Sequence, residues 1–141
     1  MDYLYPVDIR IDEDGRHVVN FPDLPECMTD GASRAEALVE AADALEEALA
    51  GRIHHKEQIP AASPRRGRPA VMPGARIAAK VALYQALAAA GVSRIELARR
   101  MGVDKTEVRR LLDPRHASSL DRLDQAVTAL SHRLTIGLRA A

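Results

Sequence analysis

The stretch SRIELARRMGVDKTEVRRLL, residues 93–112, decides the fold of the second half of the chain. Its pattern is typical of two short helices that cross tightly, because Ala98 is small enough for the contact and Gly102 suits the turn. Five apolar residues fall where they would bury the pair against neighbouring helices: Leu97, Met101, Val103, Val108 and Leu111. An ordinary helical hairpin has the same spacing, but the surrounding basic residues favour a nucleic-acid partner. We therefore predict a helix-turn-helix that enters the major groove of DNA.

The second helix of this pair would present the side chains of its first turn to base edges. Lys105, Thr106 and Glu107 lie in that turn, and Arg110 follows one turn later on the same side. Lysine and arginine donate to guanine, and Glu107 can accept from cytosine unless it caps the helix. Other side chains suit phosphates, whose contacts strengthen binding without specifying sequence: Arg94, Arg99, Arg109, Arg115, His116 and Ser118.

The two helices of the pair are expected at 94–101 and 105–112, and helices are also predicted on either side of the pair, at 75–90 and 119–131. Three pairs of residues have the spacing of N-terminal caps: Ser93 with Glu96, Asp104 with Glu107, and Ser118 with Asp121. Gly91 and Gly102 allow the left-handed turns that close the preceding helices.

The end of the chain alternates apolar and polar residues at Leu134, Ile136 and Leu138, which is typical of a short strand. A single helix-turn-helix reads only a few base pairs, so we expect a homodimer or higher homo-oligomer on an inverted repeat. The terminal strand would pair across the two-fold axis of that dimer or form an edge strand of the domain's own core.

The first half predicts a small sheet followed by one helix. Residues 7–11 alternate in the manner of a half-buried strand, with Val7, Ile9 and Ile11 facing inward. Asp14-Gly15 supplies turn chemistry, residues 17–21 form the returning strand, and residues 27–29 form a third strand.

The predicted helix begins after Ser33, which forms a capping box with Glu36. Its apolar stripe is expected to consist of Ala35, Leu38, Ala42, Leu45 and Leu49. Gly51 is placed to end the helix.

The charges of the chain are divided unevenly, although it has 20 acidic and 20 basic residues in total. Residues 1–62 carry 14 acidic and 5 basic residues, a net charge of −9, and residues 63–141 carry 6 and 15, a net charge of +9. Residues 58–74 hold four of the eight prolines, so they cannot continue a helix or a central strand. The sequence therefore predicts an α+β chain with a domain at 1–57, a crossover at 58–74 and a DNA-binding and dimerisation domain at 75–141, with two different partners.

A set of motifs in the first half comprises Tyr5-Pro6-Val7, the run from Phe21 to Gly31, Ala35-Glu36-Ala37-Leu38 and Ala44-Leu45. This set resembles the HicB antitoxins of bacterial HicA–HicB toxin–antitoxin pairs. One branch of that family carries a repressor-like helix-turn-helix after a crossover similar to 59–64 and ends in a short strand, so the resemblance covers nearly the whole chain. Glu26 stands where the family often has the glycine of a Pro-Gly-Cys turn.

The resemblance implies a partial ribonuclease-H-like fold of three to four strands and one helix, with Ala70-Val71-Met72 belonging to the fourth strand. It also implies that this domain binds a HicA-like toxin, a small basic messenger-RNA-cleaving protein, and covers its active site. In the family the complex represses its own operon by binding double-stranded operator DNA. The acidic half suits a basic toxin, and the basic half suits DNA.

A ribonuclease-H-like fold also raises the possibility of an enzyme that holds two metal ions on strand-borne carboxylates. Asp8 and Asp12 alternate with the inward-facing residues, however, and Asp23 lies in a predicted turn. His54 and His55 would diverge on a helix end, even with Glu57 nearby. We therefore expect no enzyme activity, no metal and no cofactor.

Other interpretations of the sequence carry less support. Arg65-Arg66-Gly67-Arg68 is similar to the core of a minor-groove AT hook, but a basic linker has the same composition. A stand-alone transcription regulator with a ligand-sensing first domain is the alternative function.

Cys27, the single cysteine, is expected to be buried without a chemical role. With no leader or long apolar run in the sequence, we expect a bacterial cytoplasmic protein without a membrane partner.

Overall fold

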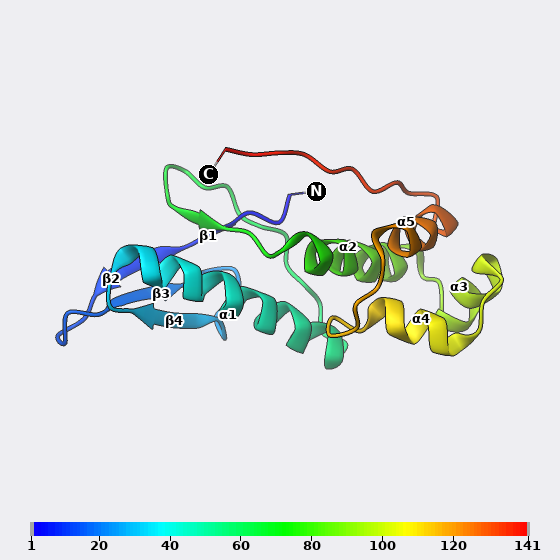
Figure 1. Cartoon of the computed structure of the whole chain (residues 1–141), viewed down its shortest axis with the longest axis horizontal. Coiled ribbons are helices and arrows are strands. Elements are labelled where there is room, and N and C mark those ends of the chain that lie inside the picture. Colours follow the sequence, from blue (N-terminus) through cyan, green and yellow to red (C-terminus); the bar gives the residue numbers. More distant parts are fainter. Residues whose placement is uncertain (1, 141) are drawn as a thin grey trace. The chain divides into compact units, whose positions relative to one another are not determined.

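A computed structural model describes residues 2–140, which form five strands and five helices. The chain divides into two compact units, Met1–Ala78 and Ala79–Ala141. The first unit contains the sheets and one long helix, and the second is helical (Figure 1). The α+β class predicted from the sequence is therefore confirmed. No helix among the described residues is long and apolar enough to cross a membrane.

The sheet of the first unit contains β2 (Asp8–Ile11), β3 (His17–Asn20) and β4 (Met28–Gly31), paired antiparallel in that order. The predicted turn between the first two strands is present, because Asp12 Oδ1 accepts hydrogen bonds from the backbone N–H groups of Asp14 and Arg16. Ile11 does not face the core as predicted, since 66% of it is exposed. It lies at the end of β2, beside the turn, where little chain covers it.

A second strand pair connects the start of the chain to the crossover. β1 (Tyr5–Pro6) pairs antiparallel with β5 (Ala70–Val71), and Val7 N–H donates to Pro69 O at 2.9 Å. A strand therefore forms within the segment 70–72 that the family resemblance implied, but it ends at Val71 and pairs with β1 in a separate two-stranded sheet rather than as a fourth strand beside β2, β3 and β4.

α1 (Arg34–His54) packs mainly on β4 and β3 and covers one face of the sheet (Figure 1). Ser33 caps it, since its side chain accepts from Glu36 N–H, and the Glu36 carboxylate accepts in return from Ala32 N–H at 3.1 Å. Gly31 permits the close approach of the helix, because a Cβ there would lie 2.5 Å from Ala37 N. The sequence thus predicted the start of this helix from its capping chemistry.

The buried face and the end of α1 differ from the prediction. The buried residues are Ala37, Ala41, Leu45, Leu49, Ala50 and Ile53, whereas Ala35 is exposed and Leu38 and Ala42 are half-buried. Gly51 does not end the helix, which continues for one more turn and buries Ile53. Burial of that side chain offsets the roughly 1 kcal/mol that a glycine costs inside a helix.

The crossover is held against the first unit by hydrogen bonds. Tyr5 Oη donates to Pro60 O at 2.8 Å, and Asp23 accepts from both the backbone N–H and the hydroxyl of Ser63, at 2.9 and 2.5 Å. Ile59 is buried. Although its composition is that of a linker, this segment is therefore an ordered part of the first unit.

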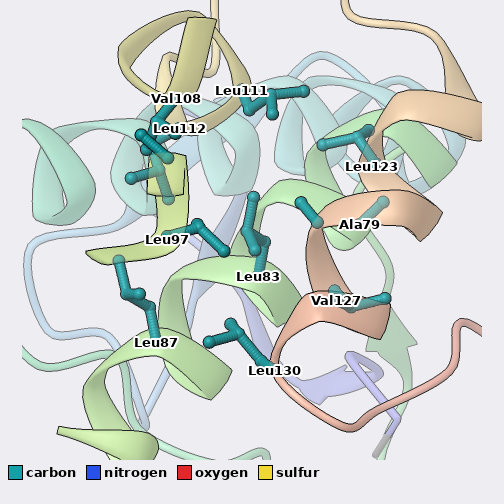
Figure 2. Packing of buried hydrophobic residues seen from close by; sticks show 12 residues of the cluster. Ala79, Leu83, Leu87, Leu97, Val108, Leu111, Leu112, Leu123, Val127 and Leu130 are labelled. Atoms are coloured by element: carbon teal, nitrogen blue, oxygen red, sulfur yellow. The ribbon is translucent and has the colours of Figure 1, made fainter. Parts of the chain in front are cut away.

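The second unit contains most of α2 (Ala75–Ala90), followed by α3 (Arg94–Met101), α4 (Lys105–Leu112) and α5 (Leu120–Ala129). Side chains from all four helices meet in one apolar core (Figure 2). In this view Leu83 and Leu87 of α2, Leu97 of α3, Leu111 of α4 and Leu123 of α5 point toward one another. The helices at 75–90, 94–101 and 105–112 have the predicted bounds.

The last helix and the tail depart from the sequence prediction. α5 is capped by Ser119, whose side chain accepts from Arg122 N–H, rather than by Ser118 with Asp121. Ser118 is instead hydrogen-bonded inside the unit. The strand predicted at 134–138 does not form, since residues 132–140 belong to no strand in the described chain. This excludes the edge-strand alternative within the single chain, and pairing with a second copy remains a prediction.

Candidate nucleic-acid interface

α3 and α4 are joined by a three-residue connection, Gly102, Val103 and Asp104. Gly102 has φ +68°, so a residue with a side chain would be strained there, and its left-handed conformation closes α3. Val103 N–H donates to Ala98 O at 3.0 Å, and Asp104 caps α4 by accepting from Glu107 N–H at 2.9 Å. The small residue, the glycine and the cap that the sequence singled out therefore meet at this connection.

α4 is divided sharply between a buried and an exposed side. Val108, Leu111 and Leu112 are at most 2% exposed and pack in the core of the second unit. The opposite side presents Lys105, Arg109 and Arg110 to solvent, with Thr106 and Glu107 half-buried. Three cations of one short helix are thus free of the core and available to a polyanion.

Glu107 does not stand free as a hydrogen-bond acceptor. Its Oε1 lies 3.3 Å from Nε of Arg122 on α5, and its backbone N–H is the donor to the Asp104 cap. The sequence interpretation allowed Glu107 either to accept from cytosine or to serve the helix start. The structure engages both its backbone and its carboxylate within the protein.

Glu96 on α3 pairs with two arginines that follow it. Arg99 Nη2 lies 2.6 Å and Arg100 Nε 3.2 Å from Glu96 Oε1, and these hydrogen bonds lower the pKa of Glu96 to about 2. Arg99 was predicted to contact phosphate, and its guanidinium would have to share its donors with this carboxylate. Arg94 lies at the start of the same helix and is half-buried.

The loop from Asp113 to Ser118 joins α4 to α5 and carries three predicted phosphate contacts. Asp113 organises it, because its Oδ1 accepts from Arg115 N–H at 3.0 Å and its carbonyl accepts from His116 N–H at 3.1 Å. The side chains of Arg115 and His116 are exposed. Ser118 is half-buried, and its hydroxyl contacts Lys80 Nζ at 3.0 Å and Arg110 O at 3.3 Å. Arg115 and His116 are thus exposed, as the predicted phosphate contacts require, whereas the Ser118 hydroxyl forms hydrogen bonds within the protein.

Two residues of this region were missed by the sequence analysis. Lys80 of α2 is completely buried, although lysine is ordinarily a surface residue, and no local pattern distinguishes it. Arg122 lies on the exposed side of α5 beside α4. Its position in the first turn of α5, three residues after the Ser119 cap, could have been found from the spacing of the cap.

The other sequence candidates are not assembled into a site. Arg66 and Gly67 have φ +50° and +81°, and Arg65 and Arg68 bond to each other's carbonyls, so this segment is a closed turn rather than the extended pair of an AT hook. His55 Nδ1 contacts Gly51 O at 2.8 Å. Residues 2–140 contain no group of three or more histidine, cysteine, aspartate or glutamate side chains placed to hold a metal ion. Cys27 is buried, as predicted, and burial raises its pKa to about 11.

The chain is therefore an α+β protein of two units. An acidic unit with the sheets and one long helix comes first, and a basic helical unit follows. The family model for a HicB-like antitoxin of a bacterial toxin–antitoxin system matches residues 4–91. Antitoxin HicB 1 of Photorhabdus laumondii is 39% identical over 134 residues, which cover 95% of this chain and 86% of the relative. Antitoxin HicB of Escherichia coli K12 is 35% identical over 133 residues, covering 94% and 96%. The chain belongs to the HicB-like antitoxin family, as its sequence motifs implied.

Proposed function

We propose that the first unit binds and neutralises a HicA-type messenger-RNA-cleaving toxin, and that the second unit represses the antitoxin's own operon through α3 and α4 acting as a helix-turn-helix. Family membership supports the antitoxin role. The division of α4 into a buried apolar side and an exposed cationic side is the observation that carries the DNA-binding half of the proposal.

Electrostatics and exposed apolar side chains support toxin binding by the first unit. Residues 1–62 carry a net charge of −9, which complements a small basic protein and speeds its association. Tight binding also needs apolar anchors. Among its described residues, the first unit exposes four large apolar side chains, Ile11, Met28, Val39 and Met72, each at least 50% exposed. We propose that toxin contacts are drawn from this set.

The exposed side of α4 supplies the proposed base contacts. Lys105 and Thr106 lie in its first turn and Arg110 in its last, so the N-terminal end of the helix would point into the major groove. The proposed phosphate contacts are Arg94, Arg109, Arg115 and His116, of which Arg115 and His116 come from the loop before α5. Glu107 is not among these contacts, because its carboxylate is paired with Arg122. The charged side chains that we propose to contact DNA are therefore all basic.

A second copy would complete the proposed DNA reader. The tail after α5 leaves Ile136 68% exposed and Leu138 fully exposed, while Leu134 packs against the core of the second unit. Two such tails, each alternating apolar and small or polar residues, can pair as antiparallel strands and bury these side chains together. We propose that this pairing forms the homodimer that holds two reading helices on an inverted repeat.

Coexpression with a HicA-type toxin, a small basic protein, tests the toxin half of the proposal. The full chain should rescue growth and co-purify with the basic protein. Lack of both results would exclude toxin neutralisation. An Arg115→Ala variant provides the matched control, because it should still rescue growth while repressing its own promoter less well. If rescue and repression were lost together, the assignment of the two tasks to separate units would be wrong.

A further inference from the structure

Lys80 is the only polar or charged residue among those described that is fully buried, and its position in the second unit is central. It lies on α2 between the core residue Ala79 and the buried Val81. Burying an ammonium group is costly unless its charge and its donors are satisfied. Its surroundings therefore reveal which parts of the unit depend on it.

Three acceptors of Lys80 belong to the end of α4 and the loop that follows. Nζ donates to Arg110 O at 2.9 Å, to Asp113 O at 2.6 Å and to Ser118 Oγ at 3.0 Å. An ammonium group has three N–H donors, so it can serve all three of these oxygens. Arg110 O, in the last turn of α4, also accepts from Asp113 N–H at 3.2 Å, and Asp113 O accepts from His116 N–H at 3.1 Å, so Nζ gives each carbonyl an additional, charged donor.

One side chain from α2 thus fixes three points on the loop that presents Arg115 and His116. Arg110 O marks the last turn of α4, Asp113 O the start of the loop, and Ser118 the residue before the Ser119 cap of α5. The positive charge also lies at the C-terminal end of α4, where it is favourable to the helix dipole. An apolar residue of similar length would fill the space but remove the charged donor that connects these three oxygens to α2.

We infer that Lys80 is a positioning residue for DNA binding, which sets the end of α4 and the loop at 113–118 without touching DNA. The inference rests on the proposed DNA-binding function. It predicts that losing the Nζ hydrogen bonds weakens operator binding even in protein that remains folded. A residue that only stabilised the core would lower the melting temperature and leave the affinity of the folded protein unchanged.

Lys80→Met tests this, with Leu87→Ala as the matched control on the same helix and in the same core. Binding of the full-length protein to a duplex covering the region upstream of its reading frame is measured at a temperature where both variants are folded by circular dichroism. We expect Lys80→Met to bind about tenfold more weakly and Leu87→Ala to stay within about twofold of the wild type. Equal affinity of the two variants would overturn the inference.

Amide hydrogen exchange supplies a readout that does not depend on DNA. In Lys80→Met the backbone N–H groups of Arg115, His116 and Ser118 should exchange faster, and in Leu87→Ala they should not. Unchanged exchange in Lys80→Met would also contradict the positioning role. If the methionine variant fails to fold, Lys80→Gln keeps a shorter donor and should show the same changes to a smaller degree. If the wild type binds no upstream duplex, the proposed DNA function fails, and hydrogen exchange alone decides whether Lys80 positions the loop.

Discussion

The carboxylate of Glu107 and the guanidinium of Arg122 join the first turn of α4 to the first turn of α5, with 3.3 Å between Oε1 and Nε. Arg122 Nη1 also donates to Gln125 Oε1 at 3.0 Å. An exposed ion pair of this kind contributes only about 0–1 kcal/mol to stability. Its main consequence is for recognition, because the one acidic side chain in the first turn of α4 is held against α5 rather than presented to a base.

Glu107→Gln should therefore leave base preference unchanged and raise affinity for all duplexes by about twofold to fivefold at low salt, since it removes a negative charge near the phosphates. The matched measurement is fluorescence anisotropy with the upstream duplex and with a scrambled duplex of equal length. A change in preferred base at one operator position, with no general gain in affinity, would show that Glu107 reads a base after all.

Lys105→Ala and Arg115→Ala should have different effects on DNA binding. Lys105 lies in the turn of α4 proposed to contact bases, so its loss should reduce discrimination against a mismatched base pair by about 1–3 kcal/mol. Arg115 lies in the exposed loop, so its loss should weaken binding to every sequence and reduce the slope of log K against log salt by about 0.9. Salt titrations with cognate and mismatched duplexes measure both quantities. The same loss of specificity in both variants would contradict the division between base and phosphate contacts.

Leu97→Ala should destabilise the second unit by about 2–5 kcal/mol, because Leu97 is fully buried among side chains from α2, α4 and α5 (Figure 2). Ile95, on the same helix, is 72% exposed, so Ile95→Ala should change the free energy of unfolding by less than about 0.5 kcal/mol. Urea denaturation followed by circular dichroism measures the difference. Similar losses in both variants would mean that α3 packs with a different face inward.

The first unit should lose stability as the pH rises above about 9. Burial raises the pKa of Cys27 from 9.0 to about 11, and burial with the nearby Asp23 charge raises the pKa of Tyr5 from 10.0 to about 12. In both cases the group in the unfolded chain loses its proton at a lower pH than in the native state. The native state therefore binds more protons in this range, and the free energy of unfolding falls as the pH rises.

Tyr5→Phe isolates the tyrosine part of this effect. At neutral pH the variant should be about 1 kcal/mol less stable, because it lacks the hydrogen bond from Tyr5 Oη to Pro60 O. The difference from the wild type should shrink between pH 10 and 12, where only the wild type has a Tyr5 hydroxyl to ionise on unfolding. Urea midpoints at several pH values provide the measurement, and a constant difference across this range would contradict the assignment.

Local chemistry explains which parts of the fold were predictable from the sequence. The caps at Ser33, Ser93 and Asp104 depend on a side chain and a backbone N–H three residues apart, so spacing is sufficient to find them. The family motifs also led to β5 at Ala70–Val71, which has too little periodicity of its own to be recognised as a strand.

The sequence predictions differ from the structure where contacts between helices and strands, rather than local spacing, determine which side chains are buried. α1 is rich in alanine, so more than one stripe along it is apolar, and packing on β4 selects the one that includes Ala37 and Ala41. Burial of Lys80 follows from carbonyls that become available only when α4 ends beside α2. The Ser118 hydroxyl accepts from the same lysine, and its contact with phosphate stays a prediction. No residue spacing encodes these contacts.

The tail after α5 provides the last prediction. Ile136 and Leu138 are exposed in the single chain and two residues apart, so in a β-strand they would lie on the same side, and an antiparallel pairing of two tails would bury them. Ile136→Asp with Leu138→Asp should therefore convert the proposed dimer to a monomer, because it places four like charges in the shared strand pair. Light scattering after size-exclusion chromatography measures the mass.

The tail also offers its own control, since in a strand Thr135 would face the side opposite to Ile136 and Leu138, and Thr135→Asp adds charge without entering the proposed apolar contact. This control should remain dimeric and bind the upstream duplex like the wild type. The double aspartate variant should bind it much more weakly, because each protomer then engages a half-site alone and the second contact is no longer intramolecular. A dimer that persists in the double variant would place the two-fold interface elsewhere on the chain and leave the exposed tail without this role.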